Sequence, residues 1–434
     1  MKKAIMFTMG TRGDVQPYIF LAQALQQADM DVTLGSHPCW EKLVSEAGVK
    51  FAPIGPDIDI ELEAAKIRGK EKNAMMAMLK TMQFVFKIVE QSAAEVYECC
   101  KGKDLVIVSH SHIGAAEAEA LHIKTVDVTL QTEMLPEITK PRTFLQRISN
   151  GLFGMMINPM IMKPYNKLRK SYGLSKVKSM DLMMSPELNL IPISKYVIEP
   201  NPYWAPQNKM VGYWYEEQTS DYEPSQELKD FLQAGEPPII LALGAMSFEA
   251  GEEREKLEIF LQAFTKSKKR AIIQGFRKTL QGYNLPETMI AVGSVPHSWL
   301  FRQGYCVIHH GGFGTSASAM LYGVPSIIIP HALDQFGVAD RLYKLGVTTE
   351  PIKASELCKE KLLDRIEYLD RNYTVISDRV KSLSAKMSEE HGLDTAVQMI
   401  QEVIRTRNDE SLEVIELTND RYRKRLFLEV IARR

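Results

Sequence analysis

The sequence alternates short apolar runs with amphipathic segments, and this alternation most constrains how the chain can fold. Apolar, β-branched runs predict buried strands at residues 3–9, 31–34, 104–109 and 125–130. Three- and four-residue spacing of apolar side chains predicts helices at residues 17–28, 40–47 and 75–97. Strands that alternate with helices are typical of a parallel sheet covered on both faces.

The same alternation starts again in the second half, after a proline-rich stretch at 192–206. Strands are expected at residues 238–243, 270–274, 289–292, 305–309 and 326–330. A chain of 434 residues is too long for one hydrophobic core. We therefore expect an α/β protein whose two Rossmann-like, doubly wound domains face a central cleft. The predicted divisions are an N-terminal domain 1–212, a linker 213–236, a C-terminal domain 237–405 and a helical tail 406–434.

Composition excludes several classes of partner and location. The formal net charge of -1 gives no field that would attract nucleic acid, so no nucleic-acid partner is expected. The five cysteines lack metal-ligand spacing, and no apolar run is long enough for a transmembrane helix. The N-terminus lacks the long apolar run of a signal peptide, so we expect a cytoplasmic protein.

Residues 140–178 are unusually basic, with nine Lys or Arg and no Asp or Glu. A packed helical pair with a solvated basic face is one interpretation. The other is an acceptor lid or a weak peripheral contact with anionic lipid headgroups.

A glycine-rich turn between a strand and a helix is the strongest local signal, in the string YCVIHHGGFGTSASAMLYG at 305–323. Gly312 and Gly314 leave the backbone N–H groups open, and the helix that starts near Thr315 adds partial positive charge. We interpret the turn as a diphosphate cradle in which His310 donates a hydrogen bond. A purely structural turn is the alternative. Neither the Walker pattern nor a dinucleotide fingerprint is present.

Two carboxylates stand just after predicted strands. Asp14 follows the first strand, where it is a candidate general base for removing a hydroxyl proton or, equally, a cap of the next helix. Asp334 and Gln335 follow the strand at 326–330, and a carboxylate beside an amide can share vicinal sugar hydroxyls.

These motifs together resemble the GT-B nucleotide-sugar glycosyltransferases, a family that includes sterol glucosyltransferases and bacterial enzymes acting on glycopeptides, macrolides and other lipophilic acceptors. The resemblance extends to about residue 405. The matching strings are GTRGDVQPYI (10–19), GSVPHSWLF (293–301), VIHHGGFGTSASAMLYGVPSIIIP (307–330) and DQFGVADRLYKLGV (334–347).

The resemblance implies roles for single residues. Asp14 would be the general base, and the turn from Gly312 to Thr315 with His310 would hold the diphosphate. The backbone of Val295 would meet the nucleobase, and Asp334 and Gln335 would contact the donor sugar. The chain departs from its plant relatives at Ser294, where they usually have Trp, and at His297, where they have Gln. Ala245 replaces a serine of the relatives, whose phosphate contact is either lost or taken over by Ser247.

The implied activity is inverting, metal-independent transfer of a hexose, glucose from UDP-glucose, to a hydroxyl of a small lipophilic acceptor. No cofactor is expected. The acceptor would be a terpenoid, sterol, macrolide or phenol, because a methionine-rich face suits varied apolar shapes. The expected acceptor-binding residues are Met82, Phe86, His112 and Met155. Packing in the core is the main expectation for the methionines of the helix at 75–97, and contact of part of that face with a ligand is the alternative. A sugar-nucleotide epimerase, a dinucleotide oxidoreductase and a non-catalytic nucleotide-sugar-binding protein are the alternatives.

Overall fold

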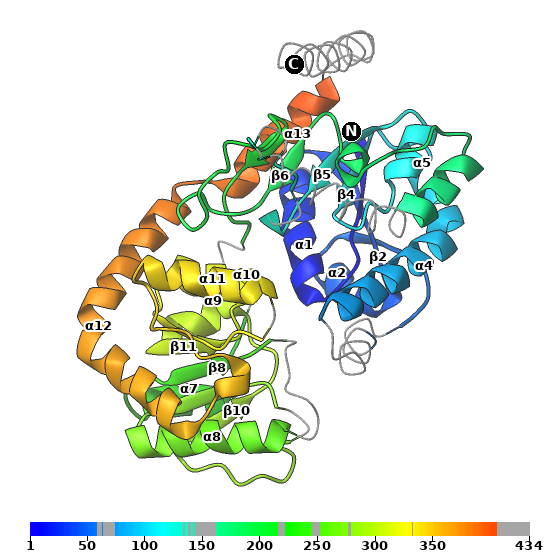
Figure 1. The fold of residues 1–434 in the computed structure, drawn as a ribbon. Helices are drawn as coiled ribbons and strands as arrows, with labels where there is room; N and C mark the ends of the chain where they lie inside the picture. Colours follow the sequence, from blue (N-terminus) through cyan, green and yellow to red (C-terminus); the bar gives the residue numbers. More distant parts are fainter. Residues whose placement is uncertain are drawn as a thin grey trace.

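The computed structural model contains two α/β lobes, each built on a parallel sheet (Figure 1). It describes residues 1–58, 63, 74–132, 135–137, 140–141, 143, 162–215, 222–244, 252–276, 279–331 and 333–405. The N-terminal sheet has the strand order β3-β2-β1-β4-β5-β6-β7, with every pair parallel. Its strands are β1 (Lys2–Phe7), β2 (Met30–Ser36), β3 (Lys50–Pro53), β4 (Leu105–Ser109), β5 (Lys124–Val128), β6 (Asn189–Ile191) and β7 (Asn208–Met210).

Helices cover both faces of this sheet because successive side chains of its strands point to opposite faces. In β1, Ala4 and Met6 belong to one core cluster, whereas Ile5 and Phe7 belong to another. The first cluster includes α1 (Arg12–Gln27), and the second includes α4 (Ala74–Cys100). The remaining helices among the described residues of this lobe are η1 (Pro38–Trp40), α2 (Glu41–Glu46), α5 (Ala115–Ala120), a helix at 162–171 and η3 (Met180–Met183).

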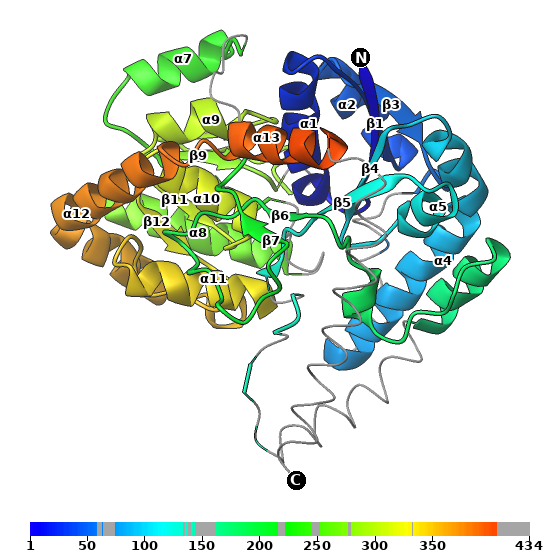
Figure 2. The same cartoon turned by 90° about the horizontal axis from the view of Figure 1, so that it is seen from above.

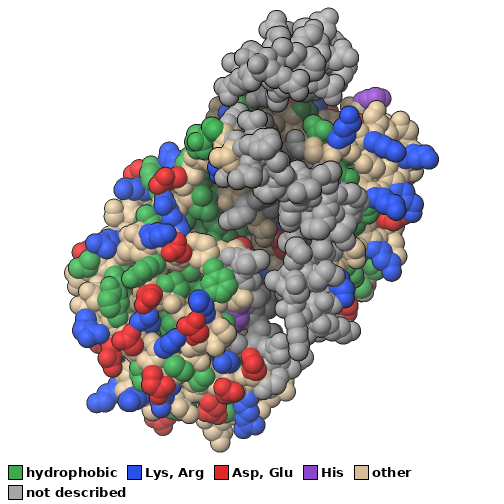
Figure 3. Space-filling view, in the orientation of Figure 1, with side chains coloured by type: hydrophobic (Ala, Val, Ile, Leu, Met, Phe, Trp, Pro, Cys, Tyr) green, Lys and Arg blue, Asp and Glu red, His purple; other side chains and the backbone are tan. Residues whose placement is uncertain are grey.

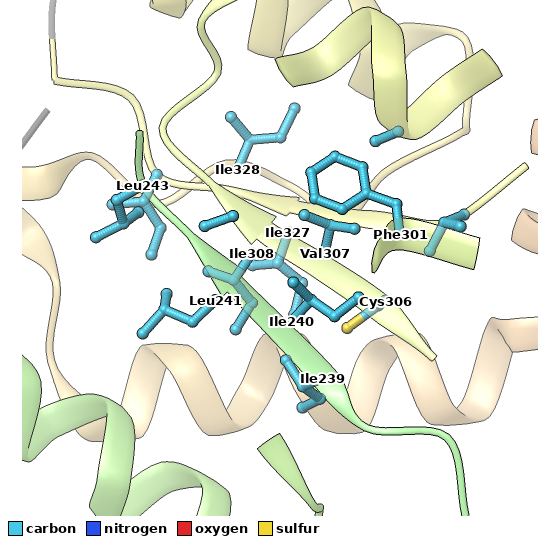
Figure 4. Close-up of a cluster of buried hydrophobic side chains, with 14 of the residues drawn as sticks. Ile239, Ile240, Leu241, Leu243, Phe301, Cys306, Val307, Ile308, Ile327 and Ile328 are labelled. Atoms are coloured by element: carbon cyan, nitrogen blue, oxygen red, sulfur yellow. The ribbon is translucent and has the colours of Figure 1, made fainter. Parts of the chain in front are cut away.

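The C-terminal sheet has the order β10-β9-β8-β11-β12, again with parallel pairs. Its strands are β8 (Ile239–Ala242), β9 (Ala271–Gln274), β10 (Met289–Val292), β11 (Cys306–His309) and β12 (Ser326–Ile328). Buried Ile, Leu and Val side chains of β8, β11 and β12 pack together with Phe301 (Figure 4). Its helices are α7 (Gln226–Gln233), α8 (Glu253–Ser267), α9 (His297–Leu300), η4 (Phe301–Gln303), α10 (Phe313–Leu321), α11 (Leu333–Lys344), η5 (Ala354–Glu356) and α12 (Lys359–Ser388).

The last described helix, α13 (Gly392–Arg405), crosses back to the N-terminal lobe (Figures 1 and 2). Its buried Ala396 and Ile400 join the core cluster of α1 and β5. The Lys124 Nζ atom also donates to the Val403 carbonyl at 2.8 Å. The predicted C-terminal domain, 237–405, therefore includes a helix whose core is in the other lobe. The predicted tail, 406–434, lies outside the described residues.

The two passages of the chain between the lobes touch each other. A Cβ built on Gly392 would lie 2.6 Å from the carbonyl oxygen of Gly212. Trp214 donates its Nε1–H to the Gly392 carbonyl at 3.2 Å, and Lys195 donates its backbone N–H to Glu390 at 3.1 Å. Side-chain-free glycines are thus needed where the passages meet.

Helix α1 begins at Arg12, whereas the apolar spacing alone predicted a start at Pro17. The earlier start follows from hydrogen bonds between Thr11 and Asp14, which close the first turn of the helix.

The basic and acidic side chains on the visible face of the C-terminal lobe are interspersed (Figure 3). No helix in the described part of the chain is long and apolar enough to cross a membrane.

Candidate active site

The turn after β1 fixes the Asp14 carboxylate. The Oδ2 atom of Asp14 accepts hydrogen bonds from the backbone N of Thr11 at 2.8 Å and from its Oγ1 at 3.0 Å. Thr8 Oγ1 donates to the Asp14 carbonyl at 2.9 Å, and Trp40 Nε1 donates to the Gly10 carbonyl at 3.2 Å. Asp14 therefore caps α1, as one interpretation of the sequence proposed. Because both contacts use Oδ2, the cap leaves Oδ1 as a possible proton acceptor.

The same turn contacts the other lobe. The Nη1 atom of Arg12 donates to Oγ of Ser294 at 3.1 Å. Ser294 lies in the loop after β10, directly before Val295. Arg12 and Asp14 share the first turn of α1, so this hydrogen bond ties the carboxylate-bearing turn to the C-terminal lobe.

The glycine-rich turn lies between β11 and α10 as the sequence predicted. Gly311 has φ +84°, and a Cβ built on it would lie 2.8 Å from Ile328. A Cβ built on Gly312 would lie 2.1 Å from Nε2 of His310. Gly314 and Thr315 follow in the first turn of α10, which contains no acidic residue. The positive end of this helix is thus available to an anion.

Four imidazoles surround the turn in their neutral form. Burial lowers the pKa of His309 to about 3 and the pKa values of His310, His297 and His331 to about 4. Their neighbours add to this depression, including Arg12 beside His297 and His331 beside His310. His309 accepts the Gly311 backbone N–H on Nδ1 at 3.1 Å. A diphosphate entering the turn would bring the negative charge that imidazole protonation requires.

The proposed donor-sugar residues lie at the start of α11. Asp334 is exposed in the first turn, whereas Gln335 is buried. Oε1 of Gln335 accepts the backbone N–H of His331 at 2.7 Å. The side chain of Gln335 is therefore fixed at the carboxyl edge of β12, on the same edge of the sheet as the cradle.

The predicted nucleobase residue, Val295, is buried in the C-terminal core. Its carbonyl accepts a hydrogen bond from Nε2 of Gln274 at 2.9 Å. Two residues further on, the ring of His297 stacks on Phe301, with centroids 4.3 Å apart. The loop after β10 is therefore held from β9, and the start of α9 packs on Phe301 of η4.

The expected acceptor residues are only partly described. Phe86 is half-buried against the core cluster that includes α4. His112 follows β4, with φ 54°, and burial lowers its pKa to about 4. Because β1 and β4 are neighbours in the sheet, His112 and Asp14 follow adjacent strands. Met155, Ser247 and the side chain of Met82 lie outside the described residues, as do residues 142 and 144–161 of the basic segment 140–178.

Sequence reasoning did not single out Arg12 and Gln274. Arg12 stands two positions before Asp14 in GTRGDVQP, but nothing local indicates a partner 282 residues away. Gln274 ends a predicted strand. Its polar side chain follows three buried apolar residues, and this contrast was the available signal for a functional residue. In the described parts of the chain, no group of three His, Cys, Asp or Glu residues could hold a metal ion.

Both lobes match known families. Residues 4–141 match the glycosyltransferase family 28 N-terminal domain, and residues 269–410 match the erythromycin biosynthesis protein CIII-like C-terminal domain. With the two parallel sheets, these matches define the class as two-lobed glycosyltransferases of the GT-B fold. The chain belongs to the GT-B glycosyltransferases, with a family 28 N-terminal lobe and an EryCIII-like C-terminal lobe.

Two curated relatives extend the comparison to more than nine tenths of the chain. A sterol 3-beta-glucosyltransferase of Arabidopsis thaliana is 27% identical over 91% of this chain and 64% of its own length. The chain therefore spans slightly less than two thirds of that relative. The O-mycaminosyltylonolide 6-deoxyallosyltransferase of Streptomyces fradiae is 26% identical over 93% of this chain and 97% of its own length.

A solved structure confirms the fold. The glycotransferase of kitacinnamycin aligns with a TM-score of 0.74 at 15% identity, covering 93% of this chain and 99% of its own. At this identity, the likeness concerns the arrangement of the two lobes and their sheets.

Proposed function

We propose that the protein transfers a hexose, glucose from UDP-glucose, to a hydroxyl of a small lipophilic acceptor, with inversion at the anomeric carbon and without a metal ion. The observation that carries the proposal is the Arg12–Ser294 hydrogen bond at 3.1 Å. It places the turn that bears Asp14 against the lobe that bears the glycine-rich cradle. The proposed base and the proposed anion site would then face each other across the two lobes.

In the proposed reaction, Asp14 takes the proton of the acceptor hydroxyl. The acceptor oxygen forms a bond to the anomeric carbon as the bond from that carbon to the diphosphate oxygen breaks. The bonding electrons leave with the diphosphate, so the products are the glycoside, UDP and protonated Asp14. The N-terminus of α10 and His310 would stabilise the charge of the leaving diphosphate. Asp334 and Gln335 would hold the sugar.

The names of the relatives support the proposed donor sugar and the proposed class of acceptor. The plant relative named as a sterol glucosyltransferase supports glucose and a lipophilic alcohol. The Streptomyces relative, named as a deoxyallosyltransferase, supports a deoxysugar donor and a macrolide as the second candidate. Both candidates use the same base and the same anion site.

The deciding experiment compares the wild type with Asp14→Asn. Asparagine keeps a carbonyl oxygen for the two Thr11 hydrogen bonds, so the cap of α1 survives while the basic carboxylate is lost. Both proteins are incubated with UDP-glucose or a dTDP-deoxysugar, with and without EDTA, and with a panel of a sterol, a terpenoid, a macrolide aglycone and a phenol. Mass spectrometry then measures the glycoside.

We expect a hexose adduct that survives EDTA and falls at least about a hundredfold in Asp14→Asn. UDP affinity and the melting temperature serve as controls and should stay close to the wild type. An adduct undiminished in Asp14→Asn would remove Asp14 as the base. UDP binding without any adduct would favour an epimerase or a nucleotide-sugar-binding protein.

A further inference from the structure

The side chain of Gln274 is held in one orientation at the carboxyl end of β9. Its Nε2 atom donates to the carbonyl oxygen of Val295 at 2.9 Å. A backbone carbonyl can only accept, so the nitrogen of the amide must face Val295. The amide oxygen, Oε1, is thereby turned away from that loop.

That oxygen is buried and has no hydrogen-bond partner among the residues the structure describes. An unpaired buried acceptor costs about 1–3 kcal/mol, so such a group in a native protein calls for an explanation. The neighbouring side chains of β9 are aliphatic and buried, so they offer no donor. Gln274 therefore presents an acceptor whose donor is absent from the described protein.

The position of Gln274 relates it to the donor site. The cradle follows β11, and Asp334 and Gln335 follow β12 on one side of it. On the other side of β11 lie β8, β9 and β10 in that order. A sugar nucleotide whose diphosphate occupies the cradle and whose sugar lies toward β12 directs its nucleoside toward β9 and β10.

Electrostatics agree with this direction. His297 lies two residues after Val295. His310 of the cradle helps to lower the pKa of His297, and His297 helps to lower the pKa of His309 at the end of β11. The loop that Gln274 holds is therefore adjacent to the diphosphate site.

We infer that Gln274 selects the base of the donor nucleotide, with its amide oxygen accepting the ring N3–H of uracil or thymine. This inference rests on the proposed function. Uracil and thymine carry a hydrogen on N3, whereas cytosine presents a lone pair there. Among pyrimidine nucleotides, cytosine would place one acceptor against another and leave Oε1 unpaired.

The test measures dissociation constants of UDP, CDP and 3-methyl-UDP by isothermal titration calorimetry. The methylated nucleotide keeps both uracil carbonyls and lacks the N3 hydrogen. Wild-type protein should bind UDP about tenfold to a hundredfold more tightly than either competitor, which is the fold-change for one unpaired acceptor.

Two matched variants complete the design. Gln274→Leu should bring the UDP-to-CDP ratio close to one. Gln303→Leu is the control. Gln303 also donates its Nε2–H to a backbone carbonyl, that of Trp299 at 3.3 Å, but it lies in η4 before β11 and not at the carboxyl edge of the sheet. This variant should keep the wild-type ratio of UDP to CDP affinity. If Gln274→Leu does not fold, Gln274→Met, which keeps the length of the side chain and lacks the amide oxygen, replaces it in the same comparison of UDP with CDP.

Equal affinity of the wild type for all three nucleotides would overturn the assignment of Gln274 while leaving nucleotide binding intact. A full preference for UDP retained in Gln274→Leu would overturn it as well. If none of the three nucleotides binds, the proposed function fails, and the assignment fails with it.

Discussion

A Cβ on Gly10 would lie 2.2 Å from the Oδ2 atom of Asp14, so only glycine lets the carboxylate occupy its observed place. Gly10 also has φ +138°, a conformation that other residues rarely adopt. The position of the proposed base is therefore determined by a residue that contributes no side chain. The first prediction follows from this relationship.

Gly10→Ala should lower kcat about tenfold to a hundredfold, because small displacements of a catalytic group have effects of that size. UDP affinity should change little, since the cradle lies in the other lobe. Steady-state kinetics and calorimetry measure the two effects. Gly13→Ala is the control, because its Cβ would be 3.6 Å from Thr11 and would fit without strain. A Gly10→Ala enzyme with wild-type kcat would show that the Asp14 carboxylate need not stay where the turn puts it.

The hydrogen bond between Arg12 and Ser294 predicts a coupled pair. Arg12→Ala and Ser294→Ala should each lower kcat/KM about twofold to tenfold, the range expected for one hydrogen bond. The double variant should be no worse than the more affected single variant, because both remove the same contact. A double-mutant cycle on kcat/KM measures the coupling. Additive losses would mean that the two residues act separately.

Asp127 predicts a pH dependence of stability. It is buried in β5, and burial raises its pKa to about 7, although the Ser185 backbone N donates to it at 2.9 Å. In the unfolded chain, its pKa is about 4. Between these values the folded protein retains a proton that the unfolded chain has released. Its contribution to the free energy of unfolding therefore falls as pH rises, by at most about 1.4 kcal/mol per pH unit.

Asp127→Asn keeps an acceptor for Ser185 and cannot ionise. The stability of this variant relative to the wild type should rise from pH 4 to 7 and then level off. Urea unfolding at each pH measures this difference. Asp104→Asn is the control, because a hydrogen bond from Lys2 lowers the pKa of Asp104 and confines its titration to more acidic pH. A difference for Asp127→Asn that is constant with pH would contradict the assignment.

The contact between the two interlobe passages predicts a position that excludes larger side chains. Gly392→Ala would bring a Cβ to 2.6 Å from the Gly212 carbonyl, and we expect a loss of about 1–3 kcal/mol in the free energy of unfolding. Gly337→Ala in α11 has no atom within 4 Å of its new Cβ and should be neutral or slightly stabilising. Chemical denaturation of both variants checks the contrast. Equal stability of the two would show that the passages can separate without cost.

Local pattern predicted β1, β2, β4 and β5 of the N-terminal lobe, the five strands of the C-terminal lobe and the turn at Gly312, because buried parallel strands need apolar runs and tight turns favour glycine. It missed β3, β6 and β7, which have only three or four residues each. It placed the start of α1 too late, since the apolar spacing begins at Pro17 whereas the Thr11–Asp14 hydrogen bonds begin the helix earlier. The spacing around Asp14 could not separate a cap from a base, and the structure shows that one carboxylate oxygen serves the cap.

Contacts between distant segments could not be predicted. The amphipathic pattern of α13 identifies an apolar face but not the lobe that covers it. The hydrogen bond from Gln274 to Val295 and that from Arg12 to Ser294 depend on how strands and lobes align. Such alignments depend on the whole fold, so neither segment carries a sequence pattern that would predict them.

The return of α13 to the N-terminal lobe has a consequence for synthesis on the ribosome. Ile400 and Val403 complete a core that includes Ala4 and Met6 of β1, a strand that the ribosome makes before the whole C-terminal lobe. The apolar face of the N-terminal lobe that α13 covers therefore stays exposed to solvent until the whole C-terminal lobe has been made. Folding of the N-terminal lobe is thus coupled to completion of the C-terminal lobe.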